Sequence, residues 1–158
     1  MKQNYEKECC PKFNPEPWNE KEINWDNKKF LKDKITSVFH IPLNFGSVMK
    51  KNMEKMIQCE ACNENTLWLT DESKLFGTDL FISTEKEIPD TEIETISGAF
   101  LTKVFEGPYK DAGKWCAQMN EYVKSQGKEV KKLYHFYTTC PKCAKKYGKN
   151  YAVLFAKV

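Results

Sequence analysis

The order of secondary-structure patterns occurs twice along the chain and constrains the fold more than any other feature. In the first copy, a β-branched and aromatic run at residues 35–41 predicts a strand. A helix is expected to open at Phe45-Gly46-Ser47, and two short strands at 66–70 and 78–84 are expected to follow it. The apolar residues of this helix recur at helical spacing and define its buried face: Met49, Met53, Met56 and Ile57.

The second copy has the same order. A strand is predicted near residues 94–105, and Glu106-Gly107-Pro108 then starts a helix, because proline suits the first helical turn. Gly127 ends that helix. Two further strands are predicted at 132–139 and 150–158. The helix has a stripe that we expect to be buried: Ala112, Trp115, Cys116, Met119, Tyr122 and Val123.

Two such halves, at about 34–90 and 91–158, predict an α+β domain built from tandem duplicated β-α-β-β units. We expect one antiparallel sheet with both helices on one face and a ligand groove at the pseudo-twofold seam. Residues 1–33 precede this pattern. Their three prolines, at 11, 15 and 17, exclude a helix or a central strand there, so the segment is expected to be an extended N-terminal arm.

Composition excludes several classes of protein. The 158 residues are 41% hydrophobic, which is too high for a disordered chain, yet no apolar run approaches the ~20 residues that span a bilayer. The N-terminus is charged and lacks the apolar stretch of a signal peptide, so a cytoplasmic protein without a membrane partner is expected. The net charge is only +3, with basic and acidic residues interleaved, which predicts no nucleic-acid binding by this chain alone.

Aromatic residues gather in and beside the predicted strands and the second helix. In Leu133-Tyr134-His135-Phe136-Tyr137 both faces of the strand are bulky, so neither face is expected simply to meet water. For any one of these rings ordinary core packing is the simpler interpretation, but together they exceed what two thin helices can cover. We therefore expect a concave apolar site. Its predicted ligand-binding residues are His40, Trp68, Phe81, Phe105, Tyr109, Trp115, Tyr134 and Tyr137.

Two carboxylates are the candidate catalytic residues. Glu72 follows a strand end, and Glu106 lies at the start of the second helix. A carboxylate beside aromatic rings can hold a cationic ligand or act as a general base toward water. The alternative interpretations are a turn residue for Glu72 and, for Glu106, an acid favoured by the helix dipole.

The seven cysteines include Cys140-Pro141-Lys142-Cys143, which has the spacing of a zinc knuckle, and Cys59-Glu60-Ala61-Cys62 repeats that spacing. A structural metal site at Cys140 and Cys143 is therefore one interpretation, and unligated thiols are another. We expect no cofactor, with a structural zinc ion as the alternative.

The run from Ser97-Gly98-Ala99-Phe100 to Phe105-Glu106-Gly107-Pro108-Tyr109 resembles the "Gly, strand, Gly-Pro-Tyr, helix" segment of the GyrI-like (gyrase-inhibitor-like) small-molecule-binding domains. The strand Tyr134-His135-Phe136-Tyr137 and its turn proline, Pro141, resemble a later segment of that family. The likeness covers about residues 34–158, and the cysteines suggest a stand-alone, Cys-containing subgroup.

The resemblance implies a groove between the halves that binds lipophilic, often cationic compounds. Some stand-alone relatives hydrolyse strained cyclopropane-bearing genotoxins with groove aromatics and a carboxylate. This chain departs from the pattern, because His135 stands where many relatives have an acid and the last strand offers no Glu. Glu72 or Glu106 would then have to replace the usual carboxylate.

Two hypotheses for the function follow. The first is a stand-alone binder of lipophilic, cationic small molecules that hydrolyses strained cyclopropane-type electrophiles and so detoxifies xenobiotics. The second is a non-enzymatic, metal-stabilised interaction or regulatory protein that uses its Cys pairs. The sequence leaves the oligomeric state open.

Overall fold

Seven strands form a single antiparallel sheet that closes on itself. A computed structural model describes residues 14–38, 41–61, 66–73, 76–138 and 150–158. The strand order is β2-β1-β4-β3-β6-β7-β5, and β5 also pairs with β1, which closes the sheet and leaves β2 outside the closed ring. Every pairing between the strands is antiparallel. The elements in chain order are β1 (Lys21–Val38), β2 (Ile41–Pro42), α1 (Phe45–Gln58), β3 (Trp68–Asp71), β4 (Phe76–Ser83), β5 (Glu92–Glu106), the 3-10 turn η1 (Tyr109–Asp111), α2 (Ala112–Ser125), β6 (Lys132–Tyr137) and β7 (Tyr151–Lys157).

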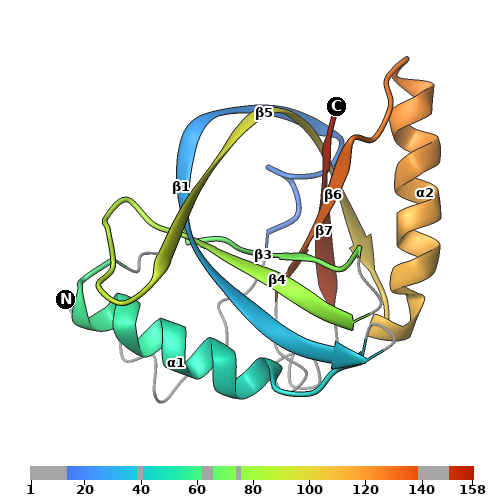
Figure 1. Cartoon of the computed structure of the whole chain (residues 1–158). Helices are drawn as coiled ribbons and strands as arrows, with labels where there is room; N and C mark the ends of the chain where they lie inside the picture. Colours follow the sequence, from blue (N-terminus) through green and yellow to red (C-terminus); the bar gives the residue numbers. More distant parts are fainter. Residues whose placement is uncertain (1–13, 39–40, 62–65, 74–75, 139–149) are drawn as a thin grey trace.

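The long strand β1 closes the sheet. Its residues 21–32 pair with β5, and its residues 30–38 pair with β4. In Figure 1, β1 and β5 run side by side as two long curved strands. The register of β1 shifts between Trp25 and Lys28, and Asn27 within this bulge has a φ of 49°. Such a bulge bends and twists a strand, which helps β1 to reach both neighbours.

Aromatic rings fill the inside of the closed sheet. Phe30, Phe81, Phe100 and Phe155 are fully buried there, and Trp25 lies 4.7 Å from Phe100 and 5.6 Å from Phe155 between ring centroids. Tyr134 packs edge-on against Phe81 at 5.7 Å. Inward and outward side chains alternate along the strands, as the pleat requires. The interior of the sheet is therefore a packed aromatic core.

The two helices cover different parts of the outer surface. α1 packs against an apolar cluster that includes Leu31, Ile35 and Leu80, while α2 packs against one that includes Leu101 and Leu154. Figure 1 shows the helices on separate sides of the sheet. The α+β class, the antiparallel sheet and the two helices agree with the sequence prediction. The chain repeats strand, helix, strand, strand, but whether the halves are a true duplication stays a prediction.

The structure corrects the extent of the predicted N-terminal arm. β1 begins at Lys21, so residues 21–33 of that segment belong to a strand, which pairs with β5 over residues 21–32 and also with β4 from Phe30 onward. Its charged outward residues and the bulge at Asn27 interrupt the apolar alternation, which hides the strand from pattern analysis. Residues 14–20 precede the strand, and the segment before residue 14 lies outside the description.

Candidate functional site

The short junction between β3 and β6 holds a group of polar side chains on the outer surface of the sheet. The two strands share one paired position, Thr70 with His135, and the indole Nε1–H of Trp68 donates to the carbonyl of Tyr137 at 2.9 Å. In β3, Leu69 points inward, so its alternating neighbours Thr70 and Glu72 do not share one face with it and Thr70 points outward. In β6, Tyr134 and Phe136 point inward, so His135 and Tyr137 point outward. The outward side chains of both strands therefore converge below α2.

Four of these side chains are linked, and we call them the β3–β6 site: Glu72, Cys116, His135 and Tyr137. The Tyr137 hydroxyl donates to Glu72 Oε2 at 2.6 Å. His135 Nδ1 lies 3.2 Å from the same oxygen, and His135 Nε2 lies 3.3 Å from Cys116 Sγ. The rings of His135 and Tyr137 are stacked, with centroids 5.8 Å apart. A thiol, an imidazole, a carboxylate and a phenol thus form one chain of contacts.

The turn after β3 fixes Glu72 in this place. The preceding residue, Asp71, accepts the backbone N–H of Ser73 at 3.1 Å, and its carboxylate lies 3.4 Å from Lys132 Nζ. Burial raises the pKa of Asp71, but the Ser73 bonds and the charge of Lys132 outweigh it and hold that pKa below its ordinary value. Asp71 therefore stays ionised and keeps the end of β3 against β6, so the next side chain, Glu72, faces His135.

Burial controls the protonation of the two groups beside Glu72. His135 is 95% buried, and this lowers its pKa below 6.5, although the negative charges of Glu72 and Asp71 act in the opposite direction. Burial also raises the pKa of the Cys116 thiol, and the charge of Glu72 adds to that rise. The imidazole and the thiol are therefore both neutral at pH 7, beside an anionic carboxylate.

The structure brings together only some of the residues predicted as site members. Trp68, Tyr137 and Glu72 meet at the β3–β6 junction. Phe81 and Tyr134 are buried inside the sheet, and Phe105 and Trp115 stack on each other beneath α2 with centroids 6.1 Å apart. In the described part of the chain these rings therefore line three different places rather than one wall.

Other predicted site residues lie away from the β3–β6 site or outside the residues that the structure describes. Glu106 ends β5, is exposed, and makes no side-chain interaction with the described residues. His40, Cys140 and Cys143 lie outside the described residues, as does the side chain of Tyr109. Among the residues that the structure describes, no group of three or more His, Cys, Asp or Glu is arranged to hold a metal ion. The zinc alternative therefore stays a prediction.

Sequence analysis did not assign Cys116 and His135 to a site. Cys116 belonged to an apolar helical stripe, and His135 stood out only as a departure from a family pattern. The missed signal was the period of two: polar residues recur at 70 and 72 in one strand and at 135 and 137 in the other. Pairing of β3 with β6 places those four residues on one face, which no local pattern reveals.

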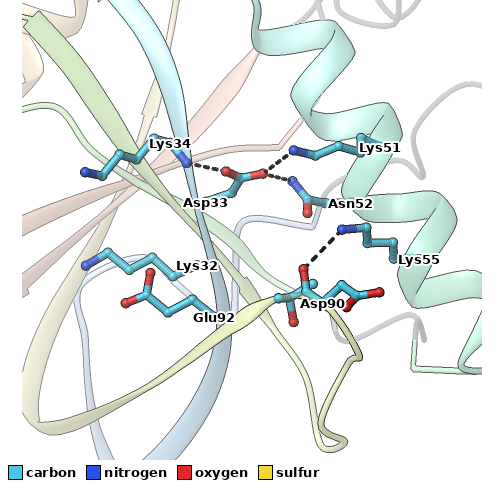
Figure 2. A pocket seen from close by; sticks show the side chains of 9 residues that line it. Lys32, Asp33, Lys34, Lys51, Asn52, Lys55, Asp90 and Glu92 are labelled. Carbon is cyan, nitrogen blue, oxygen red and sulfur yellow. Dashed lines mark hydrogen bonds and ion pairs between the residues drawn. The ribbon is translucent and has the colours of Figure 1, made fainter.

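A separate cavity of about 300 Å³ opens between α1, β1 and the start of β5. Figure 2 shows its charged lining: Lys51 and Asn52 reach toward Asp33, and Lys55 reaches toward the backbone of Asp90. Lys51 Nζ and Asn52 Nδ2 lie 3.0 and 2.8 Å from Asp33 Oδ2. This cavity contains none of the residues predicted as site members, and its polar bonds hold α1 against β1.

The fold and the site together define a small α+β protein with a carboxylate, phenol and imidazole gathered on the outside of a closed antiparallel sheet. The chain belongs to the family described as bacterial hydrolase, whose model matches residues 1–158. In the described residues no helix is both long and apolar enough to span a membrane. A comparison with functionally curated proteins finds no significant match.

Two solved structures share the fold. One is the crystal structure of a hydrolase from Listeria innocua, with a TM-score of 0.57 and 11% identity over 88% of this chain and 91% of that chain. The other is an uncharacterized conserved protein from Listeria innocua, with a TM-score of 0.58 and 12% identity over 87% and 91% of the two chains. Identities this low establish the common fold alone. The resemblance to GyrI-like domains stays a prediction beside this family membership.

Proposed function

We propose that the protein hydrolyses an electrophilic, lipophilic small molecule at the β3–β6 site, with Glu72 as the base that takes a proton from the attacking water. The observation that carries this proposal is the pair of contacts to one carboxylate oxygen. Tyr137 donates to Glu72 Oε2 at 2.6 Å, and His135 Nδ1 lies 3.2 Å from the same atom. Membership in the bacterial hydrolase family supports the reaction class.

The two oxygens of Glu72 have different surroundings. Oε2 is contacted by Tyr137 and His135 and accepts a 3.5 Å hydrogen bond from the Thr70 hydroxyl, whereas Oε1 makes no interaction with the described residues. The Glu72 side chain is 21% exposed, while the side chain of His135 is only 6% exposed. A carboxylate that is fixed through one oxygen and partly exposed can accept a water proton. Tyr137 orients the base, and Glu72 acts on the water.

The proposed substrate class is a strained ring, such as a cyclopropane conjugated to a carbonyl group. Water oxygen forms a bond to the electrophilic ring carbon while the ring C–C bond breaks, and the electron pair moves onto the carbon beside the carbonyl. Glu72 takes the water proton, and a proton from solvent ends on that carbon. The product is a ring-opened alcohol, and no oxidant or cofactor is consumed.

Aromatic and anionic groups around the carboxylate support a lipophilic, cationic ligand. The half-buried rings of Trp68 and Tyr137 flank the junction. Their faces attract cations, and the negative charge of Glu72 adds to that attraction. The charge of the ligand would pair with Glu72, and its apolar part would lie along these rings.

A pair of matched variants tests the proposal. Glu72→Gln keeps the shape of the side chain but removes the base, so we expect turnover of a carbonyl-conjugated cyclopropane to fall by about 10²–10⁴-fold. Glu106→Gln is the control, because Glu106 is exposed at the end of β5, and its turnover should match the wild type. Incorporation of ¹⁸O from labelled water identifies the hydrolytic product by mass spectrometry. Equal turnover in Glu72→Gln and wild type would remove Glu72 from the mechanism.

A further inference from the structure

Cys116 places a thiol from α2 against the buried ring of His135. Its Sγ lies 3.3 Å from His135 Nε2, and Cys116 as a residue is only partly buried. On the far side of the ring, Glu72 Oε2 lies 3.2 Å from Nδ1. The order thiol, imidazole, carboxylate is the arrangement that activates a nucleophile, with the base oriented by a third group. The water-activating step described above does not use this thiol.

The protonation states set the direction of the proton transfer. The thiol and the imidazole are both neutral at pH 7, and the donor between Sγ and Nε2 depends on the imidazole tautomer. The Glu72 carboxylate 3.2 Å from Nδ1 favours the tautomer with the ring hydrogen on Nδ1, in which the S–H donates to Nε2. That Nδ1 is buried without a hydrogen-bond partner among the described residues. Glu72 Oε2 is close to it but out of line with the N–H, so this contact is electrostatic. An imidazole that takes the thiol proton becomes cationic, and the carboxylate beside it then stabilises the new charge.

We propose that Cys116 is a covalent-modification site for uncharged, soft carbon electrophiles, with His135 as the base that receives the thiol proton. With an α-haloamide such as iodoacetamide, the Cys116 S–C bond forms while the C–I bond breaks and iodide leaves. The proton moves from sulfur to His135 Nε2 and then to solvent. The site goes beyond hydrolysis and does not depend on it, since the protein captures the electrophile in a stoichiometric reaction.

The charge of Glu72 gives this thiol a preference among electrophiles. Iodoacetamide and iodoacetate carry the same leaving group and differ in charge. The Glu72 carboxylate is on the far side of the His135 ring from Cys116 and repels an approaching anion. Iodoacetate should therefore react less well at Cys116, relative to iodoacetamide, than at a thiol without a carboxylate nearby.

Cys59 is the internal control. It is a free thiol at the end of α1, it is also only partly buried, and its side chain has no base within the described residues. Both rates are measured in the same sample by peptide mass spectrometry at pH 7. Iodoacetamide should modify Cys116 about tenfold faster than Cys59, and His135→Gln should remove that advantage while Cys59 stays unchanged. Glu72→Gln should raise the ratio of iodoacetate to iodoacetamide modification at Cys116 only.

The outcomes separate the base-assisted thiol from an ordinary buried cysteine. Loosening of the fold by His135→Gln would expose Cys116 and speed its modification, so a slower rate in that variant reports the lost base. Slower modification of Cys116 than of Cys59 in the wild-type protein would overturn the proposal even where the variant does not fold. Normal labelling of Cys116 in a protein without hydrolytic turnover would reject the hydrolase proposal and leave the thiol site intact. Hydrolytic turnover without labelling of Cys116 would reject the thiol site and leave the hydrolase proposal intact.

Discussion

Tyr137→Phe isolates the hydrogen bond on which the proposed base depends. The substitution removes the hydroxyl that donates to Glu72 at 2.6 Å but keeps the ring that stacks on His135 with centroids 5.8 Å apart. A hydrogen bond to a charged group is worth about 1.5–3 kcal/mol. That free energy corresponds to a factor of about 10–150 in rate when it is lost from the transition state.

We therefore expect Tyr137→Phe to lower kcat for the carbonyl-conjugated cyclopropane about 10- to 100-fold, with KM changing by less than about threefold. The loss should be in kcat, because the hydroxyl orients the base and does not form the ligand-binding surface. Stopped-time product analysis by liquid chromatography measures both constants. Tyr134→Phe is the matched control, since Tyr134 lies three positions earlier in β6 and points into the core, away from Glu72.

Two results would refute this reasoning. The first is a Tyr137→Phe enzyme with kcat within about twofold of the wild type. The second is an equal loss in Tyr134→Phe, which would trace the effect to packing of β6 rather than to the Glu72 contact. Thermal unfolding of both variants shows whether either substitution disturbs the fold.

Two further predictions concern stability. Burial lowers the pKa of His135, so the unfolded chain binds a proton at this residue more tightly than the folded protein does. The stability that comes from keeping His135 neutral is therefore complete above about pH 6.5, and it is lost as the pH falls below that value. Urea unfolding should show a steeper fall in stability from pH 7 to 5 for the wild type than for His135→Gln, by up to about 1.4 kcal/mol per pH unit. Equal slopes in the two proteins would contradict this prediction. Phe155→Ala should lower the free energy of unfolding by about 3–5 kcal/mol, since Phe155 is fully buried against Trp18 and Trp25, and a loss below about 1 kcal/mol in urea unfolding would show that the core collapses around the gap.

Local patterns in the sequence were sufficient to predict the helices and most strands. The helix predicted to open at Phe45-Gly46-Ser47 is α1 (Phe45–Gln58), but Ile57 of its predicted buried face is exposed. In α2 the predicted stripe includes the buried Trp115, Met119 and Val123, while the helix begins at Ala112 rather than at Glu106-Gly107-Pro108, because β5 extends to Glu106. The bulky residues on both faces of β6 also predicted that neither face meets water. Tyr134 and Phe136 point into the core, while His135 lies on the outer face and is equally buried.

Closure of the sheet could not be predicted in the same way. It depends on β1 pairing with β4 and β5 at once, and pairing between distant strands has no local signature. The bulge at Asn27 further removed the alternation that would have extended β1 back to Lys21. The same limit applies to the site, because Cys116, His135 and Glu72 come from three elements that only the tertiary fold brings together.

Closure also changes the role of the aromatic residues. An open sheet with helices on one face leaves rings free for a ligand, but a small closed sheet must fill its own interior with side chains. Phe30, Phe81, Phe100 and Phe155 serve that purpose and are fully buried. The reactive groups then lie on the outer surface, at the β3–β6 junction. Only one position is paired there, and Glu72 contacts His135 and Tyr137 of the opposite strand through side chains. The many aromatic residues of the sequence thus fill the core, whereas the reactive groups lie on the outer surface, at the junction where two strands share a single paired position.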